Sequence, residues 1–453
     1  MKRHHRAGAV AASALALVVA RAAAAQEPAG DDRYQFAAQA SEARPVSLER
    51  TPDGLRLAWS RPASDWDTAL LGLRVDAGAE ADPWIELGVA GTRVEQHLEA
   101  SARGWRWLNL SGLRERLSAG ADVAIEAHGV ALEPEGAELR LFANHLDLER
   151  RILILAPHPD DAEMAAFGLY AGSNATIVTV TSGNAGDANY RDDFPDRAEQ
   201  YLFKGYLRAV DSVTVPWQGG IPPERCFNLG YFDARLALMH SRPQEAVPEM
   251  YGPNQDVAAY RRANLGRLLP TGSRTNSWAH LVEDVGAVLA RVKPEIVVMP
   301  HPMLDIHPDH EFVAVAAVEA LARWNRPIIF LLYTNHAYED FYPFGPAGSA
   351  VSLPPWRGAA LPVEGVYSHP VTPELQRRKL YALESMHDLR LSPTEQAGCL
   401  PPGTPAKRPD YPRQPAVDYF RRGPRSNELF FVFGRDGVRQ LVASFLAQFR
   451  LDE

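Results

Sequence analysis

Two kinds of hydrophobic pattern divide the chain near residue 150. From about residue 45 to 148, apolar and polar residues alternate in short segments such as Gly54–Trp59 and Ala137–Phe142, with turn residues between them. Alternation of this kind predicts strands with one buried face, and its regular spacing predicts an antiparallel β-sandwich. Trp105 and Trp107 would share one face of a strand. That face could stack on sugar rings, but large aromatic residues are usually buried, so we expect both tryptophans in the sandwich core.

From Arg151 the apolar runs become continuous, beginning with Ile152–Ala156. Runs of this kind are typical of strands buried on both faces of a parallel sheet. Further strands are expected over residues 175–180, 212–215, 295–299 and 327–333, and helices over residues 161–172, 194–210, 277–292 and 309–324. This alternation predicts the fold class α/β, with a Rossmann-like, mainly parallel sheet and flanking helices, preceded by the β-sandwich domain.

The remaining segments complete the expected organisation. Residues 26–45 are polar and read as a flexible lead-in to a sandwich over residues 46–148, which could bind carbohydrate. The α/β domain is expected over residues 149–340, with an irregular, aromatic insertion over residues 216–272. Residues 341–453 form a proline-rich extension, with a helix over residues 372–389 and a final strand and helix that should pack on the α/β domain.

The first 25 residues have the pattern of a secretory signal peptide. Basic residues at Lys2, Arg3 and Arg6 precede an apolar run over residues 7–20, and small residues follow up to Ala25. The run is shorter than the roughly 20 residues that span a bilayer. A membrane anchor is the less favoured alternative. We therefore expect an exported protein, periplasmic or secreted, without a transmembrane anchor after cleavage.

Charge and cysteine content narrow the function. The formal net charge is −9, and loss of residues 1–25 removes four basic residues and no acidic ones, which makes it more negative still. An acidic chain of this kind disfavours nucleic acid and strongly anionic polymers as partners. Only Cys226 and Cys399 are present, which excludes a disulfide scaffold and a cysteine-rich zinc site. Whether these two pair in an oxidising compartment is left open by the sequence.

Two short motifs follow predicted strands: Pro157–Asp161, and His307–His310 with Asp305 before it. Ligand sites of open parallel sheets lie outside the carboxyl ends of the strands. The motifs can therefore meet at one edge of the sheet, although about 150 residues separate them.

The residue types of these motifs suit a divalent metal. Histidine nitrogen and carboxylate oxygen are normal zinc ligands, and His158, Asp161 and His310 would supply three of them. Asp160 would then be free to take a proton from a metal-bound water, whose pKa falls from about 15.7 to about 7. His307, as a cation, could stabilise the oxyanion or protonate the leaving amine.

Structural roles for the same residues are the alternative. Asp160 or Asp161 could simply cap the helix that follows, and Pro308 with Asp309 could form an ordinary first helical turn. Because both motifs occur together, each at a strand's carboxyl end, we favour the metal site.

On these residues, His158-Pro159-Asp160-Asp161 and His307-Pro308-Asp309-His310, the sequence resembles the PIG-L (LmbE-like) family of zinc-dependent de-N-acetylases. The resemblance covers about residues 150–335, with weaker echoes to about 435. It implies that residues 149–340 are the catalytic domain, that His158, Asp161 and His310 bind one Zn²⁺ or another divalent metal, that Asp160 is the general base, and that His307 assists at the oxyanion and leaving group. It also implies hydrolysis of an acetamide on an amino sugar.

The substrate-binding residues follow this family's pattern less closely. The family often has an Arg followed three residues later by Glu, whereas Arg197 is followed at that distance by Gln200. Further candidates lie after predicted strands: Asn184 and Asp187 in a glycine-containing turn, and Asn335 with His336. The aromatic residues of the insertion could form a sugar-stacking wall or a small core of their own: Trp217, Phe227, Tyr251 and Tyr260.

These observations predict an exported, metal-dependent hydrolase that removes N-acetyl groups from amino sugars of a cell-envelope or extracellular glycan or glycolipid, through metal-bound hydroxide. The alternatives are a metal-dependent amidase or phosphoesterase acting on a small molecule, and a non-catalytic envelope glycan-binding protein. A phosphoesterase often needs a second metal about 3.5–4 Å from the first, for which the sequence offers no second ligand cluster.

Overall fold

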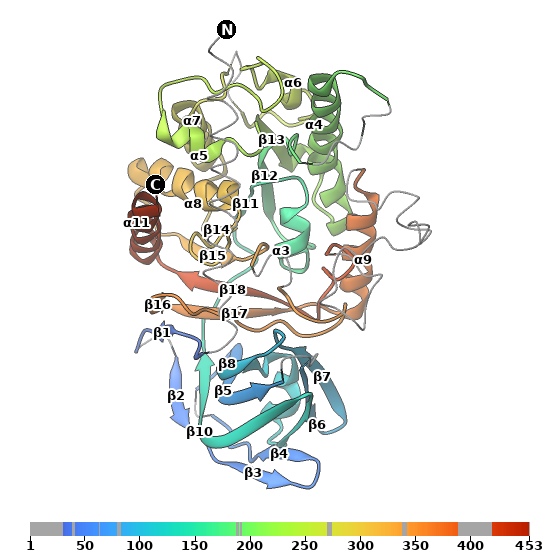
Figure 1. The fold of residues 1–453 in the computed structure, drawn as a ribbon, viewed down its shortest axis with the longest axis vertical. Helices are drawn as coiled ribbons and strands as arrows, with labels where there is room; N and C mark the ends of the chain where they lie inside the picture. The colour runs from blue at the N-terminus through green and yellow to red at the C-terminus, as the bar shows by residue number, and fades with distance from the viewer. Residues whose placement is uncertain are drawn as a thin grey trace.

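The computed structural model describes residues 30–38, 41–62, 64–78, 83–186, 190, 193–269, 274–337, 342–387 and 419–452. The predicted signal peptide, Asp187 and Cys399 lie outside these residues. A β-rich N-terminal region and a larger α/β region lie one below the other along the long axis of the molecule (Figure 1).

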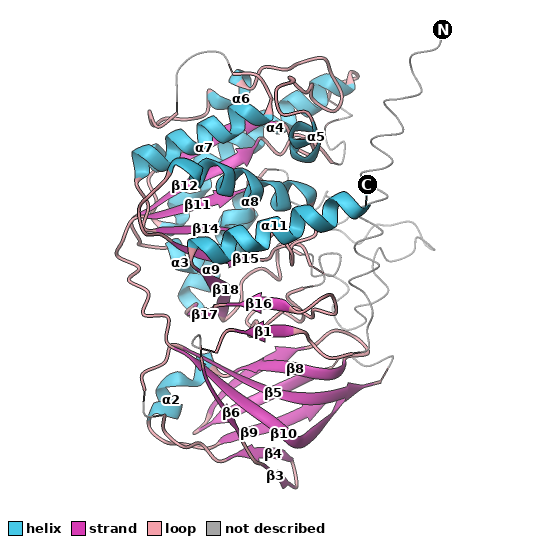
Figure 2. Cartoon of the chain, turned by 90° about the vertical axis from the view of Figure 1, so that its left-hand side faces the viewer, coloured by secondary structure: helices cyan, strands magenta, loops and turns pink. Residues whose placement is uncertain are grey.

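The N-terminal region consists of two antiparallel sheets (Figure 2). One has the order β2 (Glu42–Pro45), β10 (Val130–Phe142), β5 (Thr68–Ala77), β8 (Arg103–Asn109). The other has the order β3 (Leu48–Thr51), β4 (Gly54–Leu57), β9 (Val123–His128), β6 (Trp84–Val89), β7 (Thr92–His97). Buried side chains from both sheets, such as Leu71 and Leu87, form one hydrophobic cluster, to which the short helix α2 (Arg114–Ser118) and the 3₁₀ turn η1 (Ser111–Leu113) contribute. The expected alternation therefore produces two sheets around a shared core.

The two tryptophans of β8 correct one prediction. Trp107 is buried, but it belongs to the hydrophobic cluster of the α/β region, and Trp105 packs partly buried against that cluster. Phe36 of β1 (Tyr34–Phe36) meets the Trp107 ring edge-on at 5.1 Å. Gly72 of β5 makes room for both rings, because a Cβ there would lie within 2.7 Å of each. Their shared face therefore contacts the α/β region, with Trp107 buried and Trp105 partly buried.

The α/β region is built on a seven-stranded sheet. Its order is β13 (Cys226–Tyr231), β12 (Ala175–Thr181), β11 (Ile152–Ala156), β14 (Ile296–Pro300), β15 (Ile329–Tyr333), β18 (Asn427–Phe433), β17 (Gly365–Pro370), and the first five strands are parallel. β18 runs antiparallel to both of its neighbours. The chain leaves β11 first toward β12 and later toward β14, so the order reverses beside β11, where open sheets bind their ligands.

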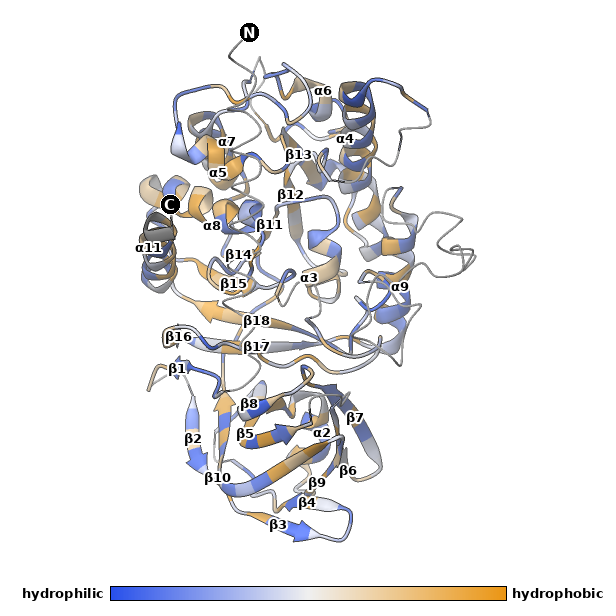
Figure 3. Cartoon of the chain, viewed as in Figure 1, coloured by the Kyte–Doolittle hydropathy of each residue, from blue (hydrophilic) through white to orange (hydrophobic). Residues whose placement is uncertain are grey.

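Helices cover both faces of this sheet (Figure 2). Leu153 and Leu155 of β11 share a cluster with α7 (Trp278–Val292), α8 (Pro308–Ala320) and α11 (Arg435–Asp452). Ile152 and Ile154 point to the other face, toward α3 (Asp161–Tyr170) and α9 (Pro373–Ser385). Strands β15 and β18 are coloured mainly as hydrophobic in Figure 3, and every residue of β11 and β14 is buried, as expected for strands covered on both sides. The remaining elements are α4 (Arg197–Thr214), α5 (Leu236–Ser241), α6 (Ala258–Arg261), η2 (Val215–Gly219), η3 (Pro223–Arg225), η4 (Leu321–Arg323) and β16 (Leu361–Val363).

Three predicted segments differ from the structure. Residues 212–215 are not a strand, because α4 continues to Thr214, and Ser212 bonds back to the Ala209 carbonyl oxygen at 2.8 Å. The third parallel strand is β13, inside the predicted insertion, so residues 216–272 are not an insertion throughout, and Phe227 and Tyr260 belong to the main core. Part of the predicted flexible lead-in forms strands: β1 (Tyr34–Phe36) pairs with β16, and β2 (Glu42–Pro45) pairs with β10.

Helix α4 turns its polar side inward. Leu202, Phe203 and Tyr206 are exposed by 42%, 37% and 46%, although they are apolar or aromatic. The buried polar side chains on its other side include Gln200, Lys204, Arg208, Asp211 and Ser212. A helix normally buries its apolar side, so the buried polar side of α4 is unusual. Among its polar side chains, Arg208 reaches the turn that follows β11, where it contacts the Pro159 carbonyl oxygen.

Candidate metal centre

The turn between β11 and α3 places three polar side chains at the sheet edge. Asp161 Oδ2 accepts the backbone N–H of His158 at 2.7 Å, which folds the carboxylate back over the turn. Asp160 has a φ of +144°, which non-glycine residues rarely adopt, so its backbone is held under strain. Asp160 occupies the N-cap position of α3, but its side chain makes no capping hydrogen bond. The helix-capping alternative therefore does not account for this carboxylate.

The turn before α8 orients the second motif. His307 is the N-cap residue of α8, and its Nδ1 accepts the backbone N–H of Asp309 at 3.2 Å. The neutral ring then carries its proton on Nε2. Pro308 occupies the first helical turn, where its missing N–H costs nothing. His310, in the same turn of the helix, is fully buried and reaches the first motif.

Three donor atoms from the two motifs form a small triangle. His158 Nδ1 lies 3.3 Å from Asp161 Oδ2, His310 Nε2 lies 3.1 Å from the same oxygen, and the two nitrogens are 3.2 Å apart. Ligands of a tetrahedral zinc with bonds of about 2.1 Å stand about 3.4 Å from one another. The triangle therefore fits the spacing of three ligands around one small divalent ion.

The other nitrogen of each ligand histidine faces a carboxylate. His158 Nε2 lies 3.2 Å from Asp233 Oδ1 and 3.3 Å from Asp309 Oδ2, and His310 Nδ1 lies 3.0 Å from Asp305 Oδ2. Metal-binding histidines usually donate their second ring N–H in this way, which fixes the tautomer and makes the free nitrogen a better ligand. Two such arrangements meeting at one triangle are typical of a metal centre.

Alternative ligand sets overlap this one. The side chains that could hold an ion also group as His158 with His307 and His310, as Asp161 with His310 and His336, and as His158 with Asp233 and Asp309. In the last set, Asp309 already accepts the backbone N–H groups of Ala234 at 2.7 Å and Leu236 at 3.2 Å. Since Asp309 faces His158 Nε2, whereas the triangle uses the other nitrogen of that ring, we assign Asp309 to the support of His158.

The charged groups of the site shift the pKa values of their neighbours. Burial alone would lower the pKa of His310, but Asp161 and Asp305 raise it to about 10. Burial would raise the pKa of Asp161, but His310 and His158 hold it well below its usual range. Burial and the neighbouring His158 and His310 lower the pKa of His307 well below its usual value. The lowered pKa favours a neutral His307 over the cation expected from the sequence.

Asp160 is held apart from the triangle by Arg208 of α4. Arg208 Nη2 donates to Asp160 Oδ2 and to the Pro159 carbonyl oxygen, both at 2.8 Å. Burial raises the pKa of Asp160 to about 6, while Arg208 acts to lower it and Asp161 to raise it. A carboxylate with a pKa near 6 can both accept and return a proton at neutral pH.

The other predicted site residues near the triangle are Asn335 and His336, whereas Asn184 supports the neighbouring loops. Asn335 Nδ2 donates to Asp161 Oδ1 at 2.7 Å, so it orients a metal ligand. The His336 ring stands 4.7 Å from the His310 ring and stacks on Tyr419 at 5.9 Å. Asn184 accepts the Asp233 N–H at 3.1 Å and donates to the Tyr260 hydroxyl at 3.3 Å, so it supports neighbouring loops.

Arg197 does not contact the triangle. Its guanidinium lies over the Tyr251 ring at 3.9 Å, at the start of α4, and the 11 residues to Arg208 correspond to about 16 Å along the helix. Arg208 is followed three residues later by Asp211, so the arginine that reaches the site lies further along the helix than predicted. Asp187 lies outside the described residues.

Sequence reasoning missed several supporting residues. Asp233 follows β13, which was not predicted as a strand, so its place at the carboxyl edge was hidden. Arg208 lies in a helix with no motif around it. Asp305 was noted only as preceding the second motif, yet its Oδ2 accepts the N–H groups of Asn335 at 2.9 Å and His336 at 3.2 Å. These contacts depend on tertiary structure.

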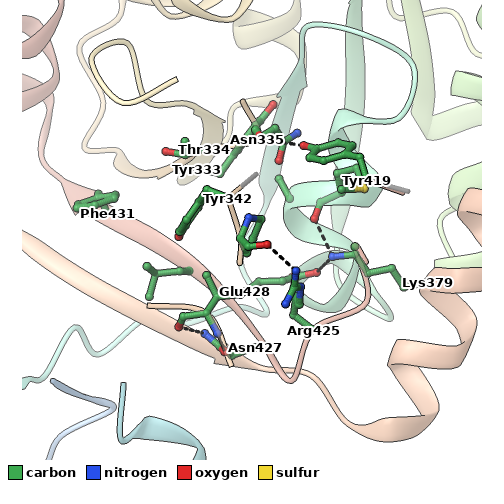
Figure 4. Close-up of a pocket in the computed structure, with 16 residues that line it drawn as sticks. Tyr333, Thr334, Asn335, Tyr342, Lys379, Tyr419, Arg425, Asn427, Glu428 and Phe431 are labelled. Carbon is green, nitrogen blue, oxygen red and sulfur yellow. Dashed lines mark hydrogen bonds and ion pairs between the residues drawn. The ribbon is translucent and has the colours of Figure 1, made fainter. Parts of the chain in front are cut away.

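A buried ion pair between Lys379 and Glu428 supports helix α3, and both residues line a small cavity (Figure 4). The helix is broken at Ala166, whose φ is −142°. Glu428 of β18 accepts the freed N–H groups of Gly168 at 2.8 Å and Leu169 at 3.0 Å. Lys379 of α9 donates to the Met164 carbonyl oxygen at 2.7 Å and to Glu428 at 3.0 Å. The C-terminal segment thereby replaces the hydrogen bonds that the kink removes and fixes the helix that carries Asp161.

A family profile matches the part of the chain in which the site lies. The PIG-L family profile, described as GlcNAc-PI de-N-acetylase, matches residues 153–321, a stretch that contains both motifs. This match supports an enzyme of the de-N-acetylase or related hydrolase type, and the grouped His and Asp side chains could bind the metal on which such deacetylases depend. No curated protein matches the chain.

Two solved structures show remote similarity. The 4-carboxy-2-hydroxymuconate hydratase GalB from Pseudomonas putida KT2440 is 14% identical, with a TM-score of 0.28, over 53% of this chain and 79% of that one. The acetyl xylan esterase Est2A from the rumen bacterium Butyrivibrio proteoclasticus is 8% identical, with a TM-score of 0.18, over 65% of this chain and 90% of that one. At these TM-scores neither similarity supports an argument about fold or activity.

Proposed function

We propose that this protein is an exported, zinc-dependent hydrolase that removes N-acetyl groups from amino sugars of a cell-envelope or extracellular glycan or glycolipid. The observation that carries the proposal is the triangle of His158 Nδ1, Asp161 Oδ2 and His310 Nε2, with sides of 3.1–3.3 Å and a carboxylate behind each histidine. A bound divalent metal would acidify a water molecule and polarise the acetyl carbonyl group.

The chain's own residues would move the protons of the reaction. Asp160 lies next to the triangle without belonging to it, and Arg208 holds it as a carboxylate. It would accept a proton from the attacking water and return it to the departing amine. His307 would donate a hydrogen bond from Nε2 to the developing oxyanion, because its Nδ1 is occupied by the Asp309 N–H.

The amino-sugar substrate and the export rest on separate arguments. The family profile is named for a de-N-acetylase of GlcNAc-PI, which supports an acetamido sugar as the reacting group. The basic, apolar and small-residue order of residues 1–25 supports export. No helix among the described residues has the length and apolar character needed to cross a membrane.

Acetate release tests the proposal directly. The full chain should release acetate from members of a panel of N-acetylated glycans and glycolipids, lose this activity in a chelator, and regain it with Zn²⁺. Asp160→Asn should abolish turnover while the protein keeps its metal, measured by elemental analysis. A metal-loaded protein that binds these glycans but releases no acetate would favour the non-catalytic alternative.

A further inference from the structure

The small cavity of Figure 4 lies beside the metal centre on the same edge of the sheet. Its lining includes Tyr333, Thr334 and Asn335, at and just after the end of β15, and Met164 and Ala165 of α3. The two metal-binding motifs follow β11 and β14, and β15 pairs with β14 in parallel. The cavity and the metal centre therefore share the carboxyl edge of the parallel strands, where open sheets bind their ligands.

Three residues of the lining connect the cavity to the metal ligands. Asn335 Nδ2 donates to Asp161 Oδ1 at 2.7 Å. The Tyr419 hydroxyl donates to the Asn335 carbonyl oxygen at 2.7 Å, and the Tyr419 ring stacks on His336. Ala165 comes four residues after Asp161 in α3, which places the two side chains on the same side of the helix, about 6 Å apart. The cavity therefore begins about one helical turn from a metal ligand.

The charged groups in the lining are already bonded to the protein. Arg425 donates to the backbone carbonyl oxygens of residues 343–346 at 2.6–2.8 Å. Lys379 and Glu428 pair with each other at 3.0 Å. Apart from the Thr334 hydroxyl and a few amide groups, the rest of the lining is aromatic or aliphatic: Met164, Tyr342, Val351, Leu429 and Phe431. An occupant therefore gains hydrophobic contact here rather than an ion pair.

The size of the cavity limits what it can hold. Its volume is about 40 Å³. A water-sized group takes up roughly 10–15 Å³ of a volume measured in this way, so about three such groups fit. A sugar ring is too large for this space. Two or three carbon atoms that extend an acetyl group fill it.

We propose that this cavity is an acyl subsite, which takes the alkyl end of an N-acyl group longer than acetyl, such as propionyl or butyryl, with the amide carbonyl directed toward the metal centre. This inference rests on the proposed function for the hydrolysis and extends it from acetyl to longer acyl groups. Water adds to the amide carbon, the C–N bond breaks, and the products are the free amine and propionate or butyrate.

Acyl preference in the metal-loaded full chain tests the acyl subsite. The probes are methyl glucosaminides with N-acetyl, N-propionyl, N-butyryl and N-hexanoyl groups, and release of the amine is measured. Each methylene group buried in the subsite should raise kcat/KM by about fourfold up to butyryl. Hexanoyl should fall below butyryl, because the cavity has no room for it. A wild type that prefers acetyl to both propionyl and butyryl would overturn the subsite.

Variants of the lining should change this preference in opposite directions. Ala165→Val fills the side of the cavity near Asp161, so the ratio of butyryl to acetyl hydrolysis should fall by about tenfold. Val351→Ala enlarges the cavity, so the ratio of hexanoyl to butyryl hydrolysis should rise, and this variant carries the test if Ala165→Val does not fold. Ala171→Val, at a partly exposed position that ends α3 outside the lining, should keep the wild-type ratios.

Direct binding separates this inference from the proposed function. NMR titration should show butyramide binding about tenfold more tightly than acetamide to the wild type, and Ala165→Val should remove the difference, with circular dichroism confirming that the variant is folded. Equal affinities for the two amides overturn the acyl subsite and leave the deacetylase proposal intact. If no glucosaminide is hydrolysed but the preference for butyramide depends on Ala165, the deacetylase proposal fails and the acyl subsite stands.

Discussion

Arg208 holds Asp160 through a contact of 2.8 Å between Nη2 and Oδ2, with both side chains buried. The arginine can approach because residue 183 is glycine, with a φ of +64°, where a Cβ would lie 2.9 Å from the guanidinium carbon. Three segments of the chain thus cooperate to orient one carboxylate: the strained turn at Asp160, the inward polar side of α4, and the turn after β12.

This relationship predicts the effect of replacing Arg208. Arg208→Met should lower kcat by about 100-fold, because a misplaced base costs about that much, while the metal content stays at the wild-type level. The acid limb of the kcat/KM profile should move to higher pH, since the guanidinium acts to lower the pKa of Asp160. Arg208→Lys should recover part of the activity. A profile that does not move in Arg208→Met would contradict the assigned role.

Asp305 should control metal affinity without touching the ion. It faces His310 Nδ1 at 3.0 Å and accepts the N–H groups of Asn335 and His336. Asp305→Asn should weaken metal binding by about 10- to 100-fold, the usual effect of losing such a partner. Competition with a chromogenic chelator measures this. His310→Ala should lose the metal altogether, and an Asp305→Asn variant with wild-type affinity would reject the support that we assign.

The buried pair behind α3 predicts a stability effect. Removing Lys379 leaves Glu428 charged and buried, so Lys379→Met should destabilise the protein by about 3–5 kcal/mol. The double variant with Glu428→Gln should lose less than the sum of the two single variants, because the two side chains share one network. Urea denaturation of all four proteins measures the coupling. Additive losses would show that the pair does not act as a unit.

The sequence was most informative where function is local. His158 and Asp161 share one turn, and His307 and His310 share another, so short spacing sufficed to propose them as neighbours. The sequence did not predict contacts between residues of different helices and strands. Asp233 follows a strand interrupted by Gly230, whose φ is +74°, and this strand does not have a continuous apolar pattern.

The misread segment at residues 212–215 has a related cause. Ser-Val-Thr-Val is typical of a strand, but Val213 is buried against the α3 side of the sheet as part of a helix. Tertiary packing overrode local propensity there. The same helix carries Arg208, so misplacing its end also concealed the residue that holds Asp160.

Acid sensitivity of folding should depend in part on His301. This residue is fully buried, its Nδ1 accepts the N–H groups of Met303 and Leu304 at 3.2 Å, and its Nε2 has no partner among the described residues. Burial lowers the pKa of His301 to about 3, against the opposing effect of Asp305. Because the unfolded chain binds a proton below about pH 6.5 and the folded chain does not, stability is fully present above that pH and falls as the pH drops toward 3.

His301→Asn separates this contribution from that of the metal centre. Asparagine keeps an acceptor for the two N–H groups but does not titrate, so the variant should lose about 2 kcal/mol less than wild type between pH 8 and pH 5. Urea denaturation at a series of pH values measures the two slopes, and the histidines of the metal centre cancel in their difference. Parallel slopes would mean that His301 is protonated in the folded protein, and that its buried Nε2 finds a partner after all.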